Sequence, residues 1–222
     1  MKKNNKLVLL GAALSMTAGI GILGASVNAD EVINAGKYTQ NVTQLQKIFT
    51  NKNKDFSLEE VSVENNKDNG QQPVYKLEGF NSKKTKEAKM KVNAEKTSDV
   101  IKNKTKKMDA DDKSDAVAID TKNVKKNPND AINLAKKYAN ENGNATEWTL
   151  KMDKVNGKET PVYKIEFESQ QNNSSSSEKA AKSSSKTKSS SSKKSSSKEN
   201  TEKKTVKLNA TNGNKISVEN DD

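Results

Sequence analysis

Two stretches of this chain alternate apolar and polar residues in nearly the same order. Residues 73–79 are Pro-Val-Tyr-Lys-Leu-Glu-Gly, and residues 161–167 are Pro-Val-Tyr-Lys-Ile-Glu-Phe. Alternation with a period of two, with β-branched and aromatic side chains, is typical of a half-buried β-strand. An Asn-Gly pair precedes each stretch, at 69–70 and at 156–157. Because Asn-Gly between alternating runs favours a tight hairpin, the pattern predicts a hairpin that occurs twice.

A helical spacing of apolar residues precedes each hairpin. The first apolar stripe begins at Val42, and Thr39 or Asn41 is the candidate N-cap. Before the second hairpin, Asn127 is followed by proline, which suits the first helical position, and then by an acidic residue. Gly143 lies where a glycine commonly ends a helix. We therefore expect one amphipathic helix before each hairpin.

A third alternating run follows each hairpin, at 88–94 and at 206–210. Residues 97–107 contain only two apolar side chains, so we expect no strand there. These elements predict an α+β fold of two small units, each with one helix on its own three-stranded antiparallel sheet (α-β-β-β). The predicted divisions are a leader at 1–29, a first unit at 38–107, a linker at 108–126 and a second unit at 127–222, which contains a Ser/Lys-rich insertion at 169–204.

The linker is acidic, and its aspartates raise the question of a calcium loop. Lys113 stands where a ligand would be needed, and no glycine follows to make the sharp turn of such a loop. We therefore favour a solvated linker and expect no metal site. The aspartates concerned are Asp109, Asp111, Asp112 and Asp115.

The insertion is almost entirely Ser and Lys, a composition that cannot bury enough apolar surface to offset the entropy of ordering. It carries much of the net charge of +11. Its lysines are candidates for contact with an anionic cell-wall polymer or membrane surface, and a solubilising spacer or a modification site are the alternatives. The lysines singled out are Lys186, Lys188, Lys193, Lys194 and Lys198.

The first residues have the layout of a secretory signal peptide. A positive start precedes an apolar run of small residues, and a small-x-small site ends at Ala29 just before Asp30. We expect cleavage between these two residues and a secreted or envelope-associated product, and the alternative is an uncleaved membrane anchor. Because no Cys follows the apolar run, we expect no lipid attachment of the bacterial lipoprotein kind.

Composition narrows the possible chemistry. The chain has no Cys and no His, so thiol nucleophiles, His-containing triads and the usual zinc and haem ligands are excluded. All basic residues are Lys. Without Arg the chain has no guanidinium group to form paired hydrogen bonds with guanine edges or phosphates, so we expect no nucleic-acid partner. Ser and Lys are abundant together only in the insertion, which cannot hold a catalytic geometry. We expect no enzyme activity and no cofactor.

The second unit resembles a PepSY domain, a family found in bacterial envelope proteins and in propeptides of secreted peptidases. The resemblance covers about residues 127–220 and, more weakly, about 39–101. It implies a non-enzymatic protein-binding module that acts on an envelope or secreted peptidase as an inhibitor or chaperone-like regulator. It carries over no catalytic residues. The resemblance rests on Ala131, Ala135, Gly143, Tyr163, Ile165, Val206, Leu208, Ala210, Thr211 and Gly213.

We treat the shared residues as structural. Tyr75 and Tyr163 have apolar neighbours at strand spacing, which favours the core over a binding role. An exposed strand edge in each sheet would offer a partner the means to add a strand. The alternative function is a polycationic surface protein held by the Lys/Ser-rich insertion. The structural motif residues are Pro73, Tyr75, Leu77, Gly143, Pro161, Tyr163, Ile165 and Gly213.

Overall fold

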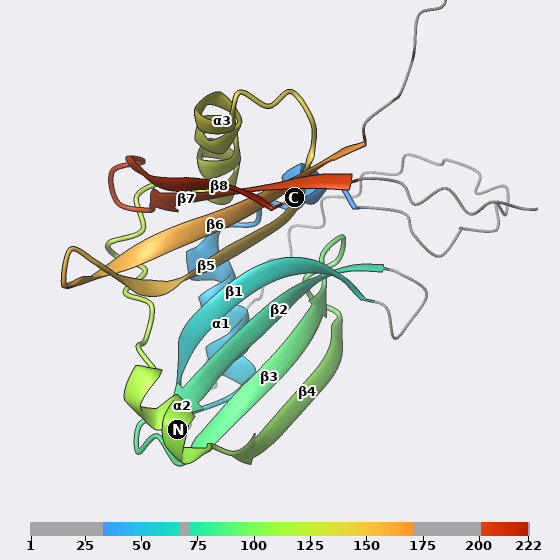
Figure 1. The fold of residues 1–222 in the computed structure, drawn as a ribbon. Coiled ribbons are helices and arrows are strands. Elements are labelled where there is room, and N and C mark those ends of the chain that lie inside the picture. Colours follow the sequence, from blue (N-terminus) through green and yellow to red (C-terminus); the bar gives the residue numbers. More distant parts are fainter. Residues whose placement is uncertain (1–32, 67–71, 171–200, 222) are drawn as a thin grey trace, which may run out of the picture. The chain divides into compact units, whose positions relative to one another are not determined.

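Eight antiparallel strands form one continuous sheet in the order β4-β3-β2-β1-β5-β6-β7-β8 (Figure 1). This computed structural model describes residues 33–66, 72–170 and 201–221. The helical segments are η1 (Ala35–Lys37), α1 (Val42–Lys52), α2 (Ala110–Asp115) and α3 (Pro128–Ala139). The strands are β1 (Phe56–Asn66), β2 (Gln72–Asn81), β3 (Lys86–Asn93), β4 (Val100–Lys107), β5 (Ala145–Val155), β6 (Lys158–Gln170), β7 (Thr201–Asn209) and β8 (Lys215–Asp221).

The predicted fold class, two small units with separate three-stranded sheets, is wrong. The first strands of the two halves, β1 and β5, pair antiparallel and join the halves into one sheet. In this joint Val61 lies opposite Leu150, and Val63 lies opposite Trp148. All four side chains are buried, so the joint continues the apolar face without a break. An alternating pattern shows which face of a strand is buried but not which edges meet, and this is why the sequence did not predict the joint.

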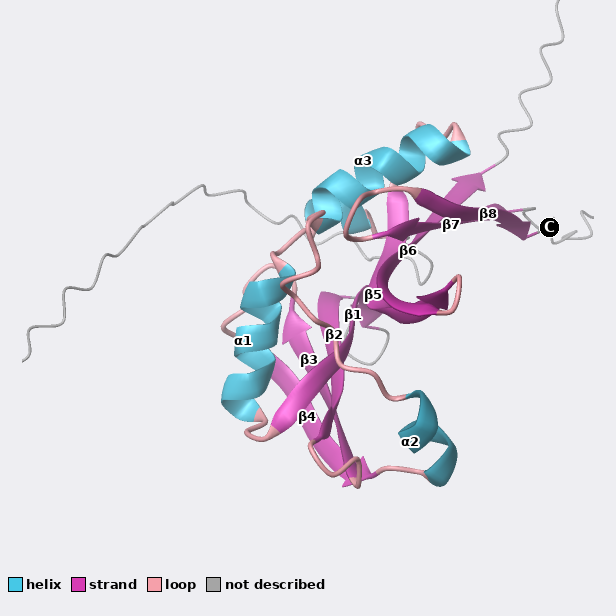
Figure 2. Ribbon diagram, turned by 90° about the vertical axis from the view of Figure 1, so that its left-hand side faces the viewer, coloured by secondary structure: helices cyan, strands magenta, loops and turns pink. Residues whose placement is uncertain are grey.

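Two helices cover one face of the sheet. Figure 2 shows α1 and α3 on the same side and α2 on the other. Leu45 and Phe49 of α1, and Ala131 and Ala135 of α3, belong to one buried apolar cluster together with the inward residues of the strands. The second, smaller cluster consists of Phe80, Met108 and Ala116, and it lies under the segment that contains α2. The sheet therefore has one apolar face and one mainly polar face.

The predicted helix starts and the second hairpin turn are confirmed. The side chain of Asn41 accepts a hydrogen bond from the Thr43 amide at 2.8 Å, and that of Asn127 accepts one from the Asp130 amide at 2.9 Å. Asn156 and Gly157 both have positive φ, at 52° and 76°, which is the backbone of a two-residue hairpin turn. The first Asn-Gly pair lies outside the described residues.

Gly143 does not end the second helix as predicted. Asn140 is the C-cap residue, with a left-handed backbone at φ 53°, and its amide donates to the carbonyls near the helix end. Gly143 lies further along the chain and a Cβ there would meet nothing within 4 Å. Asn tolerates the left-handed region better than most residues, so it can replace glycine at this position.

The acidic linker and residues 97–107 before it are also more structured than predicted. Residues 100–107 form β4, whose six last residues are all exposed. The linker contains α2, and the Ile119 amide donates to the Leu58 carbonyl at 2.8 Å. Ile119 itself is buried, with 3% of its surface exposed. An edge strand of lysines has no apolar alternation, and so the pattern gave no signal for β4.

Some predictions concern residues that the structure does not describe. The leader, with Ala29 and Asp30, lies outside the described residues, as do Lys186, Lys188, Lys193, Lys194 and Lys198 of the insertion. The predicted bounds of the insertion, 169–204, overlap both neighbouring strands, because β6 runs to Gln170 and β7 begins at Thr201. Within the described part of the chain, no helix has the length and apolar character needed to cross a membrane.

Candidate protein-binding edges of the sheet

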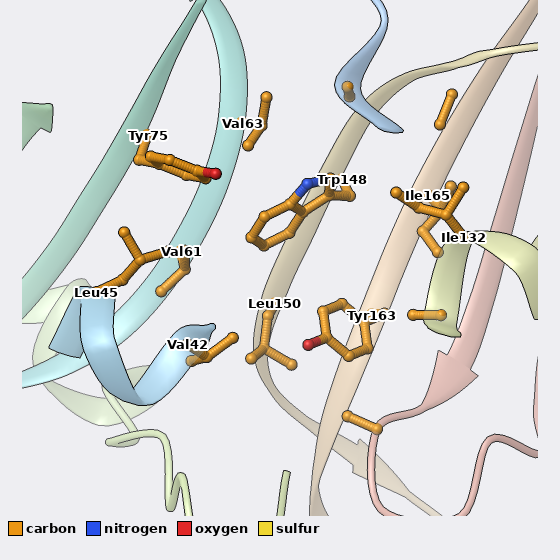
Figure 3. Close-up of a cluster of buried hydrophobic side chains, with 14 of the residues drawn as sticks. Val42, Leu45, Val61, Val63, Tyr75, Ile132, Trp148, Leu150, Tyr163 and Ile165 are labelled. Atoms are coloured by element: carbon orange, nitrogen blue, oxygen red, sulfur yellow. The ribbon is translucent and has the colours of Figure 1, made fainter. Parts of the chain in front are cut away.

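The motif residues of the two hairpins lie on the apolar face under the helices. Tyr75, Leu77, Tyr163 and Ile165 have at most 1% of their surface exposed, which confirms that both tyrosines are core residues. Figure 3 shows Trp148 between the strands that carry the two tyrosines. Its ring centroid lies 6.2 Å from that of Tyr75 and 6.1 Å from that of Tyr163. Aromatic pairs in such tilted arrangements add to the stability that burial gives.

Each tyrosine hydroxyl binds the backbone just before a helix. The Tyr75 hydroxyl accepts a hydrogen bond from the Gln40 amide at 3.0 Å, one residue before the N-cap of α1. The Tyr163 hydroxyl donates to the Lys126 carbonyl at 3.1 Å, one residue before the N-cap of α3. Burial raises the pKa of both tyrosines, so both hydroxyls stay protonated. These tyrosines fix the helices to the sheet and are not available to a partner.

The prolines and Gly213 have structural positions as well. The Pro73 carbonyl accepts from the Ala94 amide at 3.0 Å, and the Pro161 carbonyl accepts from the Ala210 amide at 2.8 Å. Gly213 has φ 82°, and a Cβ on it would lie 2.8 Å from a methyl carbon of Leu134. Its carbonyl accepts from the Tyr138 hydroxyl at 3.0 Å. None of these groups is free to bind a ligand.

The face opposite the two helices carries rows of Lys and Glu that form ion pairs across the strands. Near the centre, Glu78 pairs with Lys76 at 2.5 Å and with Lys89 at 2.7 Å. Burial acts to raise the pKa of Glu78, but the two ammonium groups outweigh it and hold the pKa below its usual value. Lys164 and Glu166 pair in the same way on β6, at 2.6 Å. The charges near the centre of this face and on β6 are therefore largely neutralised.

Glu59 is an exception on this side of the molecule. A register shift between Leu58 and Glu60 lets β1 bulge at Glu59. Burial, together with the negative charges of Glu78, Glu60, Glu87 and Asp112, raises the pKa of Glu59 to about 7. The described residues contain no group of acidic side chains arranged to hold a metal ion. We expect the raised pKa of Glu59 to make the stability of the fold depend on pH.

Joining the two halves leaves β4 and β8 as the edges of the sheet. The pairing of each edge strand with its neighbour contains one register shift at an equivalent position. The shift leaves one isoleucine without a cross-strand residue opposite it, Ile101 on β4 and Ile216 on β8. Their side chains differ. On the polar face β4 presents Lys102, Lys104 and Lys106, whereas β8 presents Ser217 and Glu219 at the positions that match the first two.

β8 carries an exposed apolar side chain. Ile216 has 37% of its surface exposed and is the only large hydrophobic residue that is exposed in the described part of the chain. Beside it on the strand, Val218 packs partly against the core. A sheet edge with unpaired backbone groups and an apolar side chain is a template for an added strand, whereas a row of lysines protects an edge from pairing. The two edges therefore differ in what they can bind.

Periodicity and hairpin signals could not identify these edges. The sequence predicted an accessible edge on each of two separate sheets, but β1 and β5 use one edge each to pair with each other. The alternation of Ile216 and Val218 is that of a strand, and such a pattern does not distinguish an edge strand from a core strand. The strand order, in which β8 pairs with β7 alone among the described strands, is what shows that these residues lie at an edge.

Comparison with known proteins supports the fold. The chain matches no protein-family model and has no significant match among curated proteins. It is similar to a crystal structure of a protein from Clostridium difficile 630, described as a "putative lipoprotein", with a TM-score of 0.56 and 24% identical residues. The similarity covers 83% of this chain and 95% of the other. An experimentally determined protein thus shares most of this fold.

Proposed function

We propose that this chain is an exported, non-enzymatic protein-binding module that receives an extended segment of a partner along β8. The observation that carries the proposal is the exposed Ile216 on an edge strand with few lysines. An added strand would gain main-chain hydrogen bonds from β8, and Ile216 would give it an apolar contact. The other edge, β4, bears lysines that disfavour strand addition.

The partner class follows from the resemblance to PepSY domains. It is an envelope or secreted peptidase that the chain inhibits or assists in folding. The edge geometry identifies the binding strand, and the resemblance supplies only the class of partner. Two features support an exported, envelope-associated location: the signal-peptide layout of residues 1–29, and the similarity to a protein described as a lipoprotein.

The test is capture from the extracellular and wall fractions of the source cells at high salt. The bait is the full exported protein, compared with the variants Ile216→Lys and Ile101→Lys. These two changes add the same charge at matching positions of the two edges, so Ile101→Lys controls for charge and for loss of an isoleucine. We expect a partner that binds the parent and Ile101→Lys but not Ile216→Lys, and that protects β8 amides from hydrogen exchange.

Equal capture by all three proteins would overturn the assignment of β8, as would protection confined to other strands. A captured peptidase is then assayed with and without the chain. Inhibition or improved refolding that is lost with Ile216→Lys supports the regulatory role. An unchanged peptidase in both assays contradicts that role while leaving the binding edge in place.

A further inference from the structure

The pairing of β3 with β4 places lysines directly opposite one another. Three of their cross-strand pairs are Lys86 with Lys107, Lys89 with Lys104, and Lys91 with Lys102. Like charges directly opposite on a sheet are destabilising. Electrostatic repulsion between these opposing lysines therefore destabilises this end of the sheet.

Acidic neighbours pair with Lys89 and Lys91 on β3 and with Lys106 on β4, but not with Lys104. On the polar face Lys89 pairs with Glu78 at 2.7 Å, and Lys91 pairs with Glu64 at 3.0 Å. Both carboxylates come from strands on the inner side of β3. Lys106 pairs with Glu87, but Lys104 forms no ion pair with any residue of the described chain. The charge of Lys104, on the outer edge, thus has no acidic partner among the described residues.

The β4 lysines form a regular row. Lys102, Lys104 and Lys106 alternate along one strand and share the polar face with Lys89 and Lys91. Residues two apart in a strand are about 6.7 Å apart. Residues 102–107 are all exposed. A flexible linear anion that lies along β4 would therefore meet an ammonium group every 6 to 7 Å or so.

Protection of an edge from aggregation explains lysines on β4 but not the lysines opposite them on β3. Lysines on the edge strand alone would protect it. The matching edge offers the comparison, because Lys89 opposite Lys104 corresponds there to Thr205 opposite Glu219. The doubled row of lysines is thus particular to the β3–β4 end.

We propose that the polar face of β3 and β4 binds a linear phosphodiester polyanion, with Lys89, Lys91, Lys102, Lys104 and Lys106 as its contacts. The phosphates would relieve the repulsion between opposing ammonium groups, and binding would release counterions and weaken with salt. Lysines make such contacts as point charges, without the base-reading fork of Arg. The site recognises a charged backbone and not a sequence of bases.

The experiment measures binding of the full exported protein to poly(glycerol phosphate) and to an oligothymidylate across a range of salt concentrations. The variant is Lys102→Gln/Lys104→Gln. The matched control is Lys154→Gln/Lys158→Gln, which removes two exposed lysines from the β5–β6 hairpin and has the same net charge. Because every protein retains the Lys/Ser-rich insertion, any difference between variant and control reports on β4.

We expect the β4 variant to bind about tenfold more weakly at low salt, and its salt slope to fall by about 1.4. We expect the control to bind like the parent, and thermal unfolding to show both variants folded. A preference for poly(glycerol phosphate) identifies a wall-type polymer, and equal binding of both probes identifies the phosphodiester backbone alone.

Equal weakening by the variant and the control overturns the proposal, because net charge or the insertion would then explain binding. Unchanged binding by the β4 variant also overturns it. Binding of the same proteins to anionic phospholipid vesicles is measured as well. A β4 variant that loses vesicle binding but keeps both polymers shows that the lysines serve a membrane surface, which contradicts a polymer site.

Discussion

The ring of Phe49 on α1 lies directly over Gly79 on β2. A Cβ at residue 79 would lie 2.9 Å from two carbons of that ring and would clash with the Ser57 carbonyl oxygen. Phe49 is the eighth residue after the N-cap of α1, and Gly79 directly follows the Pro-Val-Tyr-Lys-Leu-Glu motif. The equivalent residues of the other half are Ala135 on α3 and Phe167 on β6. The helix supplies the aromatic ring in one half, and the strand supplies it in the other.

This relationship predicts that Gly79→Ala lowers the free energy of unfolding by about 2 kcal/mol or more. The strain comes from a backbone oxygen, which cannot rotate away as a side chain could. Phe49→Leu in the same chain should therefore fail to restore stability. Urea denaturation of both variants is the measurement, with Gly143→Ala as the control because a Cβ there is in open space. Stability of the Gly79→Ala protein equal to the control would contradict this packing.

The Tyr163 hydroxyl leads to a second prediction. Tyr163→Phe removes the donor to the Lys126 carbonyl and should cost about 1 kcal/mol, the usual value of such a bond. Tyr38→Phe is the control, because its hydroxyl makes only a long, exposed contact of 3.4 Å with Glu95. Denaturation should show the loss in the first variant alone. Equal effects of the two changes would show that the Tyr163 bond does not stabilise the start of α3.

Glu59 predicts a dependence of stability on pH. Its pKa is about 7 in the fold against 4.5 as the usual value, so the folded chain keeps a proton that the unfolded chain loses. The unfolded state therefore binds fewer protons between about pH 4.5 and 7, and stability falls as pH rises through this window. Since the side chain is only half-buried, we expect a loss of about 1 kcal/mol after discounting for solvent screening.

Glu59→Gln should remove this dependence. The variant should be more stable than the parent at pH 8 and no more stable at pH 4. Glu159→Gln, on the exposed hairpin, is the control and should follow the parent at every pH. Thermal unfolding at a series of pH values is the measurement. A parallel pH profile for Glu59→Gln and the parent would contradict the raised pKa.

The opposing lysines predict a substitution that stabilises. Lys104→Gln removes the repulsion with Lys89 and should raise stability by a few tenths of a kcal/mol at low salt. The gain should disappear near 1 M salt, where charges are screened within about 3 Å. Lys154→Gln, which faces no lysine across its hairpin, is the matched change. Chemical denaturation at the two salt concentrations tests it, and a gain independent of salt would point to a cause other than charge.

The sequence predicted the local elements better than their assembly. The N-caps at Asn41 and Asn127 and the turn at Asn156-Gly157 use short-range chemistry, which can be recognised in the chain itself. The burial of Tyr75 and Tyr163 followed from the alternation. The pairing of β1 with β5 depends on two edges far apart in sequence, and no local signal specifies which edges meet.

The candidate surfaces were the least predictable part. The sequence predicts no strand at β4 because residues 102–107 contain no apolar alternation, and only the pairing with β3 shows that they form one. The exposure of Ile216 follows from the place of β8 at the edge of the sheet, which no local pattern specifies. Both surfaces follow from the strand order, and so they could be found only after the two halves had been joined.

β1 and β5 join the two halves into one sheet, which leaves β4 and β8 as its edges. Hydrogen exchange of the full chain tests this arrangement. We predict that the amides of residues 60–63 and 148–151 exchange only with global unfolding, while those of β4 and β8 exchange earlier through local opening. Exchange of residues 60–63 and 148–151 as fast as the amides of β8 would show two separate sheets and contradict the account.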